Sequence, residues 1–215
     1  MGRRIVLCGA ASKRGGYVAE VLKQRGHDVF GVGLHGPDYA IDFAHAGDDV
    51  GEQVFSRATA RFDAPPDTLI ILSSKHYAAG MHQHSATDLA QAMNVNFVVP
   101  FMLLKDFYRI AELHDVEDAA AVLALIAGNS PQAVAFNASK AALRSMLQTV
   151  ALDEVSDSGT TCVRLFGVAR TCETCSPFGR LDEPEEMANV VTYMVEDAPA
   201  FMSGTVVTLG GGTGG

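Results

Sequence analysis

Short apolar runs alternate with longer segments of helical period along the whole chain of 215 residues. Seven of the runs are typical of short strands, most of them apolar at every position, as in a sheet that is covered on both faces. We predict these strands at Arg4–Cys8, Val29–Val32, Tyr39–Phe43, Thr68–Leu72, Ala120–Ile126, Cys162–Phe166 and Thr205–Leu209. Strands separated by helices in this way form a parallel sheet with right-handed crossover connections.

Helices are predicted between the strands, where apolar residues recur every three to four positions. They span Tyr17–Arg25, Asp48–Arg61, Ala86–Leu113, Gln132–Val155 and Glu183–Glu196. The third is expected to be interrupted or kinked near Pro100, because proline cannot donate the helical hydrogen bond. No repeat, low-complexity tract or linker divides the sequence. We therefore expect one three-layer α/β/α domain over residues 1–215, a doubly wound parallel sheet of the Rossmann type with about seven strands.

A glycine-rich segment follows the first predicted strand. In a doubly wound sheet the ligand site lies beyond the carboxyl ends of the strands. Gly9 and Gly15 fall between the first strand and the first helix, with Ser12 between them. Glycines at such a turn let the backbone approach a pyrophosphate, and the helix N-terminus offers free N–H groups to it. This segment is therefore a candidate phosphate-binding loop.

An ordered set of segments resembles the short-chain dehydrogenase/reductase family across nearly the whole chain. Cys8–Gly15 resembles the fingerprint Thr-Gly-x-x-x-Gly-x-Gly, with Lys13 at the second glycine. Met93–Asn96 resembles the family's Val-Asn, and Phe136–Leu143 resembles Tyr-x-Ala-Ser-Lys-Ala-Ala-Leu. Two later stretches match the family's C-terminal part: Arg180–Ala188 and Ser203–Gly212.

The resemblance implies which catalytic residues are retained and which are lost. In the family a Tyr transfers the substrate proton, a Lys four residues later lowers its pKa, a Ser polarises the carbonyl and an Asn supports a proton relay. Lys140 and Asn96 occupy the Lys and Asn positions. Phe136 stands at the Tyr position, and the Ser position falls at Ile126 or Ala127. Phenylalanine has no exchangeable proton, so it cannot act as a general acid or base.

The same resemblance implies a nicotinamide dinucleotide as cofactor. Its predicted contacts are Gly9, Ser12, Lys13, Arg14, Gly15, Asp42, Ser73 and Lys140. Gly33 stands where an NAD enzyme carries an acidic residue for the adenosine ribose. Lys13 and Arg14 suit a 2′-phosphate, which favours NADP(H) slightly over NAD(H). Lys13 also replaces a glycine that permits close approach, so weak or lost binding stays open.

Two further stretches depart from the family's pattern. The Pro-Gly that follows the sixth strand corresponds to Val168-Ala169. Few residues lie between Thr174 and Arg180, where relatives carry a lid over the substrate. A site without that lid excludes water poorly, which does not favour hydride transfer.

The segment after the fourth strand holds residues that offer a replacement for the lost tyrosine. His76, Tyr77, His82 and His84 could supply an acid–base group or a metal pair. An ordinary polar surface loop is the favoured interpretation, because loops collect such residues. Ser130, just past the fifth strand, is a candidate stand-in for the missing serine.

The cysteines do not predict a metal or disulfide site. Cys172 and Cys175 have the C-x-x-C spacing, but a structural zinc needs two further ligands and none is near in sequence. A coincidental pair in a loop is favoured over a functional one. Cys8 and Cys162 are predicted to be buried as small hydrophobic residues.

Composition excludes some partners. The formal net charge of −9 comes from 25 acidic against 16 basic residues, which argues against nucleic acid or an anionic membrane as a partner. No apolar stretch approaches the length of a membrane helix, and no secretory signal precedes the first strand, so we expect a cytoplasmic protein. The helices near residues 97–107 and 141–152 are apolar on more than one face. Because the family pairs subunits through these helices, we expect a homodimer or homotetramer.

Two functions follow from the sequence, and enzymatic activity stays open between them. The first is a pseudoenzyme, a divergent NAD(P)-binding-fold protein that cannot perform standard carbonyl or alcohol hydride transfer and serves as a binding or regulatory subunit. The second is an NADP(H)-dependent oxidoreductase, or an enzyme of altered chemistry, that uses Lys140 with residues of the His76–His84 loop or Ser130. The substrate is not predicted.

Overall fold

The computed structural model describes residues 2–76, 79–126, 131–158, 163–171, 176 and 178–212. In this part of the chain seven parallel strands form one sheet, in the order β3-β2-β1-β4-β5-β6-β7. The strands are β1 (Arg4–Cys8), β2 (Asp28–Gly33), β3 (Tyr39–Ala40), β4 (Thr68–Ile71), β5 (Ala119–Ile126), β6 (Val163–Arg170) and β7 (Val206–Leu209). The α-helices are α1 (Lys13–Gln24), α2 (Val50–Phe62), α3 (Ala86–Met93), α4 (Val99–Leu113), α5 (Val134–Ser158) and α6 (Pro184–Glu196). Shorter helical turns are η1 (Met81–Gln83), η2 (Asn94–Val98) and η4 (Ala200–Met202).

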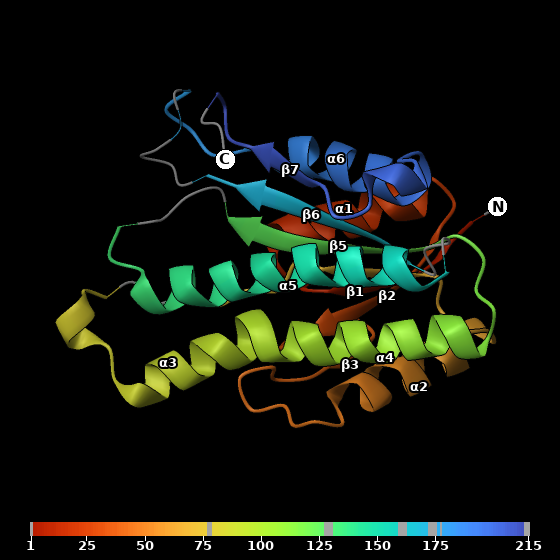
Figure 1. The fold of residues 1–215 in the computed structure, drawn as a ribbon, viewed down its shortest axis with the longest axis horizontal. Coiled ribbons are helices and arrows are strands. Elements are labelled where there is room, and N and C mark those ends of the chain that lie inside the picture. Colours follow the sequence, from red (N-terminus) through yellow and green to blue (C-terminus); the bar gives the residue numbers. More distant parts are fainter. Residues whose placement is uncertain are drawn as a thin grey trace.

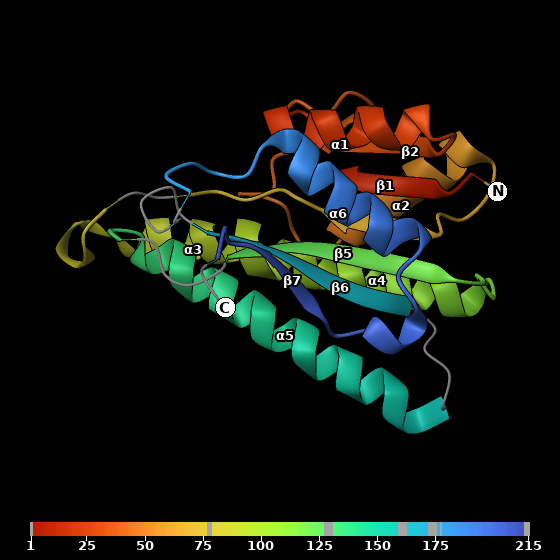
Figure 2. The ribbon, with the colours of Figure 1, turned by 90° about the horizontal axis from the view of Figure 1, so that it is seen from above.

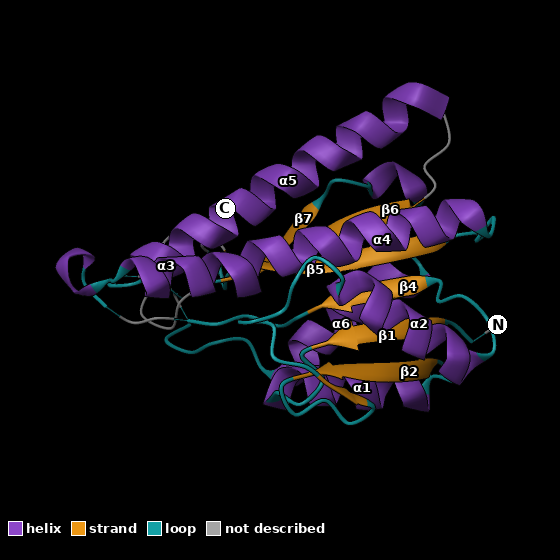
Figure 3. Ribbon diagram, turned by 90° about the horizontal axis from the view of Figure 1, so that it is seen from below, coloured by secondary structure: helices purple, strands orange, loops and turns teal. Residues whose placement is uncertain are grey.

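Helices cover both faces of the sheet. Helices α1 and α6 pack together on one face, and α2, α4 and α5 lie against the other (Figure 2). Figure 3 shows α4 and α5 side by side over the sheet. The arrowheads of β5, β6 and β7 point to one edge of the molecule (Figure 1), where parallel strands present their carboxyl ends. The predicted doubly wound α/β fold is confirmed.

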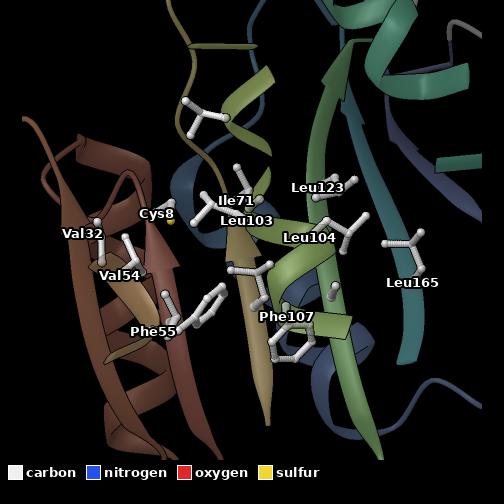
Figure 4. Packing of buried hydrophobic residues seen from close by; sticks show 14 of the residues in the cluster. Cys8, Val32, Val54, Phe55, Ile71, Leu103, Leu104, Phe107, Leu123 and Leu165 are labelled. Carbon is white, nitrogen blue, oxygen red and sulfur yellow. The ribbon is translucent and has the colours of Figure 1, made fainter. Parts of the chain in front are cut away.

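Strand β1 shows how the sequence builds the two cores. Ile5 and Leu7 belong to the cluster beneath α1 and α6, whereas Val6 and Cys8 belong to the cluster beneath α2 and α4. Successive side chains of a strand point to opposite faces, so a continuous apolar run is needed when both faces are covered. Figure 4 shows the second cluster, in which the rings of Phe55 and Phe107 stack with centroids 6.0 Å apart.

Helix α1 begins at Lys13, earlier than the predicted start at Tyr17. The side chain of Ser12 accepts a hydrogen bond from the N–H of Gly15 at 3.0 Å and caps the helix. Sequence periodicity misses this first turn because its residues are polar or glycine. The early start places Lys13 and Arg14 at the helix N-terminus.

Strand β6 extends to Arg170, beyond the predicted end at Phe166. It pairs with β5 along its whole length, up to Ile126 opposite Arg170. Val168 and Ala169 are therefore buried inside the strand and do not follow it, which corrects the position predicted for the family's Pro-Gly. Arg170 ends the strand instead.

The predicted helix over residues 86–113 is broken upstream of Pro100. Its interruption is the π-helical turn η2, and Pro100 lies in the first turn of α4, where a missing N–H costs nothing. Among the described helices, none combines the length and apolar character that a membrane crossing requires.

Candidate nucleotide-binding cavity

A cavity of about 740 Å³ lies beyond the carboxyl ends of the central strands, at the edge of the sheet where this fold class holds ligands. Its lining comes from the segments after β1, β2, β3 and β4, the ends of β5 and β6, and helix α5. Seven of the predicted cofactor contacts line it: Gly9, Ser12, Lys13, Arg14, Asp42, Ser73 and Lys140. Gly15, the eighth, packs directly behind Gly9.

The glycine-rich loop forms a tight cradle against the segment after β4. Gly9 has φ +96°, a conformation that side chains disfavour, and a Cβ atom there would lie 2.7 Å from the backbone nitrogen of Ser73. A Cβ atom on Gly15 would lie 2.1 Å from the carbonyl oxygen of Gly9. Both glycines are therefore required for the loop to lie this close to its neighbours. The first N–H groups of α1 have no helical partner and are suited to bind an anion.

Two hydroxyl groups of the cavity lining have no hydrogen-bond partner among the described residues. They are Ser73 Oγ, after β4, and Thr171 Oγ1, after β6. Buried polar atoms in native proteins nearly always have a partner, and in a ligand site the ligand can supply it. A polar ligand is therefore expected to complete the lining.

Cationic groups dominate the ionisable lining. Among the described residues of the cavity, Lys13, Arg14, Lys75, Lys140 and Arg170 accompany one carboxylate, that of Asp42. This carboxylate is engaged by His45, whose Nδ1 lies 2.7 Å from Asp42 Oδ2, and this contact lowers the Asp42 pKa. The cavity therefore favours an anionic ligand.

Arg14 is held by a buried acid outside the cavity lining. Its Nε lies 3.3 Å from Asp182 Oδ2, and one terminal nitrogen donates to the Asp182 carbonyl at 3.0 Å. Arg170 donates from Nε to Asp182 Oδ1 at 2.6 Å. One carboxylate thus joins the phosphate-loop helix to the end of β6, and it neutralises one of the two guanidinium charges.

Lys140 is almost completely buried on α5. Its Nζ donates a hydrogen bond to the Ala124 carbonyl in β5 at 2.8 Å. Burial in this position lowers the pKa of the Lys140 amine from 10.5 to about 7. The lowered pKa makes the amine able to gain charge when an anion binds.

Asn96 is fully buried in η2 and contacts main-chain groups. Its Nδ2 donates to the Lys75 carbonyl at 2.9 Å and to Ser139 Oγ at 3.0 Å, and its Oδ1 accepts from the Lys75 N–H at 2.8 Å. Asn96 does not line the cavity. Asn96 therefore holds the segment after β4, which includes the neighbouring Ser73 and Ser74, from outside the cavity.

Phe136 and Ile126 line the cavity together with Lys140. The Phe136 ring lies against the imidazole of His76, with centroids 4.8 Å apart and an edge-to-face arrangement. Ala127, the alternative position for the family's serine, lies outside the described residues, as does Ser130. His76 is thus a titratable group that touches Phe136 in this cavity.

The remaining histidines and cysteines do not gather in the cavity. His82 is exposed on η1, and neither it nor His84 belongs to the lining. Tyr77, Cys162, Cys172 and Cys175 lie outside the described residues. In the part of the chain that is described, no three His, Cys, Asp or Glu side chains come together as metal ligands.

Cys8 is fully buried with a free thiol, as predicted. Burial raises the pKa of this thiol to about 12. The thiol is therefore inert at neutral pH, because the thiolate is the reactive form.

Sequence reasoning missed Arg170 and Thr171. The sequence did carry a signal. The uncharged run Leu165–Ala169 ends at a charged residue, Arg170, which is where the strand could have been predicted to end. Predicting the strand end too early placed both residues in a loop of no assigned role. The ladder with β5 brings them to the cavity.

Solved structures of dehydrogenases have the same fold as this chain. A 4-hydroxyisoleucine dehydrogenase complexed with NADH and succinate superposes with a TM-score of 0.85 at 18% identity, over 97% of this chain and 98% of that chain. A short-chain dehydrogenase from Bacillus anthracis gives 0.84 at 19% identity, over 97% and 95%. A ligand-free aldohexose dehydrogenase from Thermoplasma acidophilum gives 0.84 at 16% identity, over 97% and 92%. No family model matches the sequence.

Proposed function

We propose that this chain is a divergent relative of the short-chain dehydrogenases that binds a nicotinamide dinucleotide and does not catalyse standard carbonyl or alcohol hydride transfer. In this proposal it serves as a binding or regulatory subunit. The observation that carries the proposal is the pairing of the close-packed glycine loop at Gly9 and Gly15 with Phe136 at the position of the proton donor.

Retained binding is supported by the geometry of the phosphate loop. Gly9 and Gly15 provide the close approach, Ser12 caps α1, and the unpartnered Ser73 hydroxyl faces the same cavity. The excess of cationic groups in the lining suits a pyrophosphate. One solved structure with this fold is a complex with NADH.

Loss of standard chemistry is supported by the residues around Lys140. A bound nicotinamide supplies the hydride, but a carbonyl substrate also needs a proton and a polarising hydrogen bond. Phe136 has no proton to give, and Ile126 has no hydrogen bond to offer. Lys140 can hold a ribose or an anion, and its Nζ is engaged by the Ala124 carbonyl in β5.

The choice between the two dinucleotides depends on Lys13 and Arg14. Both line the cavity at the N-terminus of α1, and Gly33 leaves β2 without an acid that would repel a 2′-phosphate. Arg14 is already engaged by Asp182, so Lys13 is the group we expect to contact that phosphate. We therefore propose a preference for NADP(H).

An activity panel with NADH and NADPH tests the loss of chemistry. We expect no substrate-dependent cofactor oxidation by the natural chain over a broad set of aldehydes and ketones. We also expect none from Phe136→Tyr, because Ile126 still lacks a polar group. Turnover by either protein at a rate proportional to its concentration would contradict a dismantled site.

A second function is favoured by one contact. The His76 imidazole lies against the Phe136 ring and lines the same cavity as Lys140, so it is positioned to replace the tyrosine as an acid. In that case the panel yields turnover in the natural chain, and His76→Gln abolishes it. His82→Gln is the matched control, since His82 lies outside the lining.

A further inference from the structure

Lys140 is the buried member of the five lysines in this sequence. The other four are exposed: Lys13, Lys23, Lys75 and Lys105. Lys140 is 3% exposed and nevertheless lines the cavity, so a small molecule in the cavity can contact it. The cavity therefore offers its ligands one amine that is largely removed from water.

The surroundings of the Lys140 amine favour its neutral form. Its Nζ donates to the Ala124 carbonyl at 2.8 Å, and among the described residues no carboxylate pairs with it. Burial without a counter-charge penalises the ammonium ion, and the pKa falls to about 7 for this reason. A neutral amine that donates one N–H keeps its lone pair. A desolvated lysine of this kind is a nucleophile.

Two apolar side chains accompany Lys140 in the cavity lining. Phe136 lies one helical turn before it on α5, and Ile126 ends β5, the strand that also contains Ala124. Neither side chain can exchange a proton or donate a hydrogen bond. The group that this wall offers to a carbonyl compound is therefore the amine itself. Apolar neighbours also protect a product on the amine from hydrolysis by water.

We propose that Lys140 is a covalent capture site, at which its amine forms an imine with a small aldehyde that carries an anionic group. The nitrogen lone pair attacks the carbonyl carbon to give a carbinolamine. This adduct loses water, so that a C=N bond replaces the C=O bond. Both protons of the neutral amine leave with the aldehyde oxygen as water, and no oxidant, reductant or further reactant is consumed.

The charge of the cavity selects the class of aldehyde. The cationic side chains of the lining attract a carboxylate or a phosphate group. The described lining contains one carboxylate, that of Asp42, and His45 already engages it. A protonated imine at Lys140 therefore takes its counter-charge from the ligand. The capture site goes beyond the proposed function and shares only the cavity with it.

Reductive trapping on the full chain tests the capture site. Glyoxylate is the anionic probe and propanal the uncharged one, cyanoborohydride reduces each imine to a stable amine, and peptide mass spectrometry locates the modified lysines. At pH 7 we expect glyoxylate to modify Lys140 at least about tenfold faster than the exposed lysines, because an ordinary lysine amine with a pKa of about 10.4 is almost fully protonated there. The preference for Lys140 over Lys105 is expected to be at least about threefold larger with glyoxylate than with propanal.

The chain supplies its own controls. Lys13 and Lys75 line the same cavity but are exposed, so they share the attraction of the anionic probe without the desolvation. Lys105, on α4, is exposed and lies outside the lining. Lys140→Met removes the amine and keeps a side chain of similar length, and thermal denaturation checks that this variant folds. The comparison among the lysines of the natural chain does not depend on the variant.

Selective modification of Lys140 supports the capture site, and a rate no greater than at Lys13 and Lys75 would overturn it. Equal selectivity with both probes would overturn the requirement for an anionic group. A parallel titration with NADPH separates these results from the proposed function. NADPH binding without selective modification contradicts the capture site and leaves the proposed function. Selective modification without NADPH binding contradicts the proposed function and leaves the capture site. A chain that shows neither contradicts both.

Discussion

Lys140 and Phe136 lie one helical turn apart on α5 and line the same cavity. This spacing places them on one face of the helix, which in the family brings the lysine close to the tyrosine. Here the lysine donates to the Ala124 carbonyl, and burial desolvates its amine. The ionisable group at this position is therefore a buried amine whose pKa is set by its burial.

The buried amine makes stability depend on pH. The folded pKa of Lys140 is about 7 against 10.5 for the exposed side chain, so the unfolded chain binds more protons between these values. The free energy of unfolding therefore rises with pH above about 7 and is lower below it. Relative to Lys140→Met, we expect the natural chain to gain up to about 1.4 kcal/mol per pH unit between pH 7 and 9. Urea denaturation at pH 7, 8 and 9 measures this gain.

The comparison with Lys140→Met matters because Cys8 acts in the opposite direction. Its folded pKa of about 12 is raised from 9.0, so its contribution is lost as pH rises above about 9. Both proteins contain Cys8, and its effect cancels in the difference. Parallel stability curves for the two proteins over this pH range would show that the Lys140 amine is not desolvated in the folded chain.

At the scale of elements, the π-helical turn η2 connects α3 to α4 and directs Asn96 toward the segment after β4. π-Helical turns are rare and occur often beside functional sites. Asn96 donates to the Lys75 carbonyl and Ser139 Oγ and accepts from the Lys75 N–H, so one side chain joins the segment after β4 to helix α5. The cavity wall at Ser73 and Ser74 depends on this connection.

Substituting Asn96 by Ala tests this dependence. The change leaves the Lys75 backbone groups with fewer partners, and we expect the free energy of unfolding to fall by about 2–4 kcal/mol. We also expect weaker NADPH binding, because Ser73 is no longer held. Ser203→Ala is the matched control, since Ser203 Oγ accepts a hydrogen bond from the Leu165 N–H and neither residue lines the cavity. A stability loss in Asn96→Ala without any change in NADPH affinity would limit the residue to a structural role.

The strands of the sheet could be predicted from the sequence, but the residue at which β6 ends could not. Buried apolar runs give β1, β4 and β5 within a residue or two, because both faces of these strands are covered. The end of β6 was misplaced because glycine and a charged residue resemble a loop in sequence, whereas pairing with β5 decides where the strand stops. Long-range pairing of this kind leaves no local signal.

The glycine-rich loop is the part of the candidate site that could be predicted from the sequence. Gly9 and Gly15 fall where a turn between strand and helix requires them, so their roles follow from local structure. The role of Arg170 depends on Asp182, twelve residues later, and on Arg14 from the other end of the chain. Such a cluster exists only in the folded chain.

At the scale of the molecule, apolar side chains remain on the outer surface of the layer formed by α4 and α5. Phe101, on α4, and Leu152, on α5, are 43% and 72% exposed. Large exposed apolar residues that lie on neighbouring helices are typical of subunit interfaces. We therefore propose that two copies of the chain associate through these helices.

Light scattering after size-exclusion chromatography tests the association. We expect a mass of at least twice the 22.7 kDa of one chain. The double variant Phe101→Arg, Leu152→Arg is expected to have the mass of one chain, because buried charges disrupt an apolar interface. Phe201→Arg is the control, since Phe201 is fully exposed on η4. A natural chain that elutes with the mass of one chain would contradict the proposal.

The central claim is that the cavity binds a dinucleotide although the proton donor is lost. Calorimetric titration of the natural chain with NADPH and with NADH tests this claim most directly. We predict saturable binding of one dinucleotide per chain, with NADPH the tighter ligand and with Lys13→Ala reducing that preference. Absence of saturable binding of either dinucleotide at millimolar concentration would contradict the account.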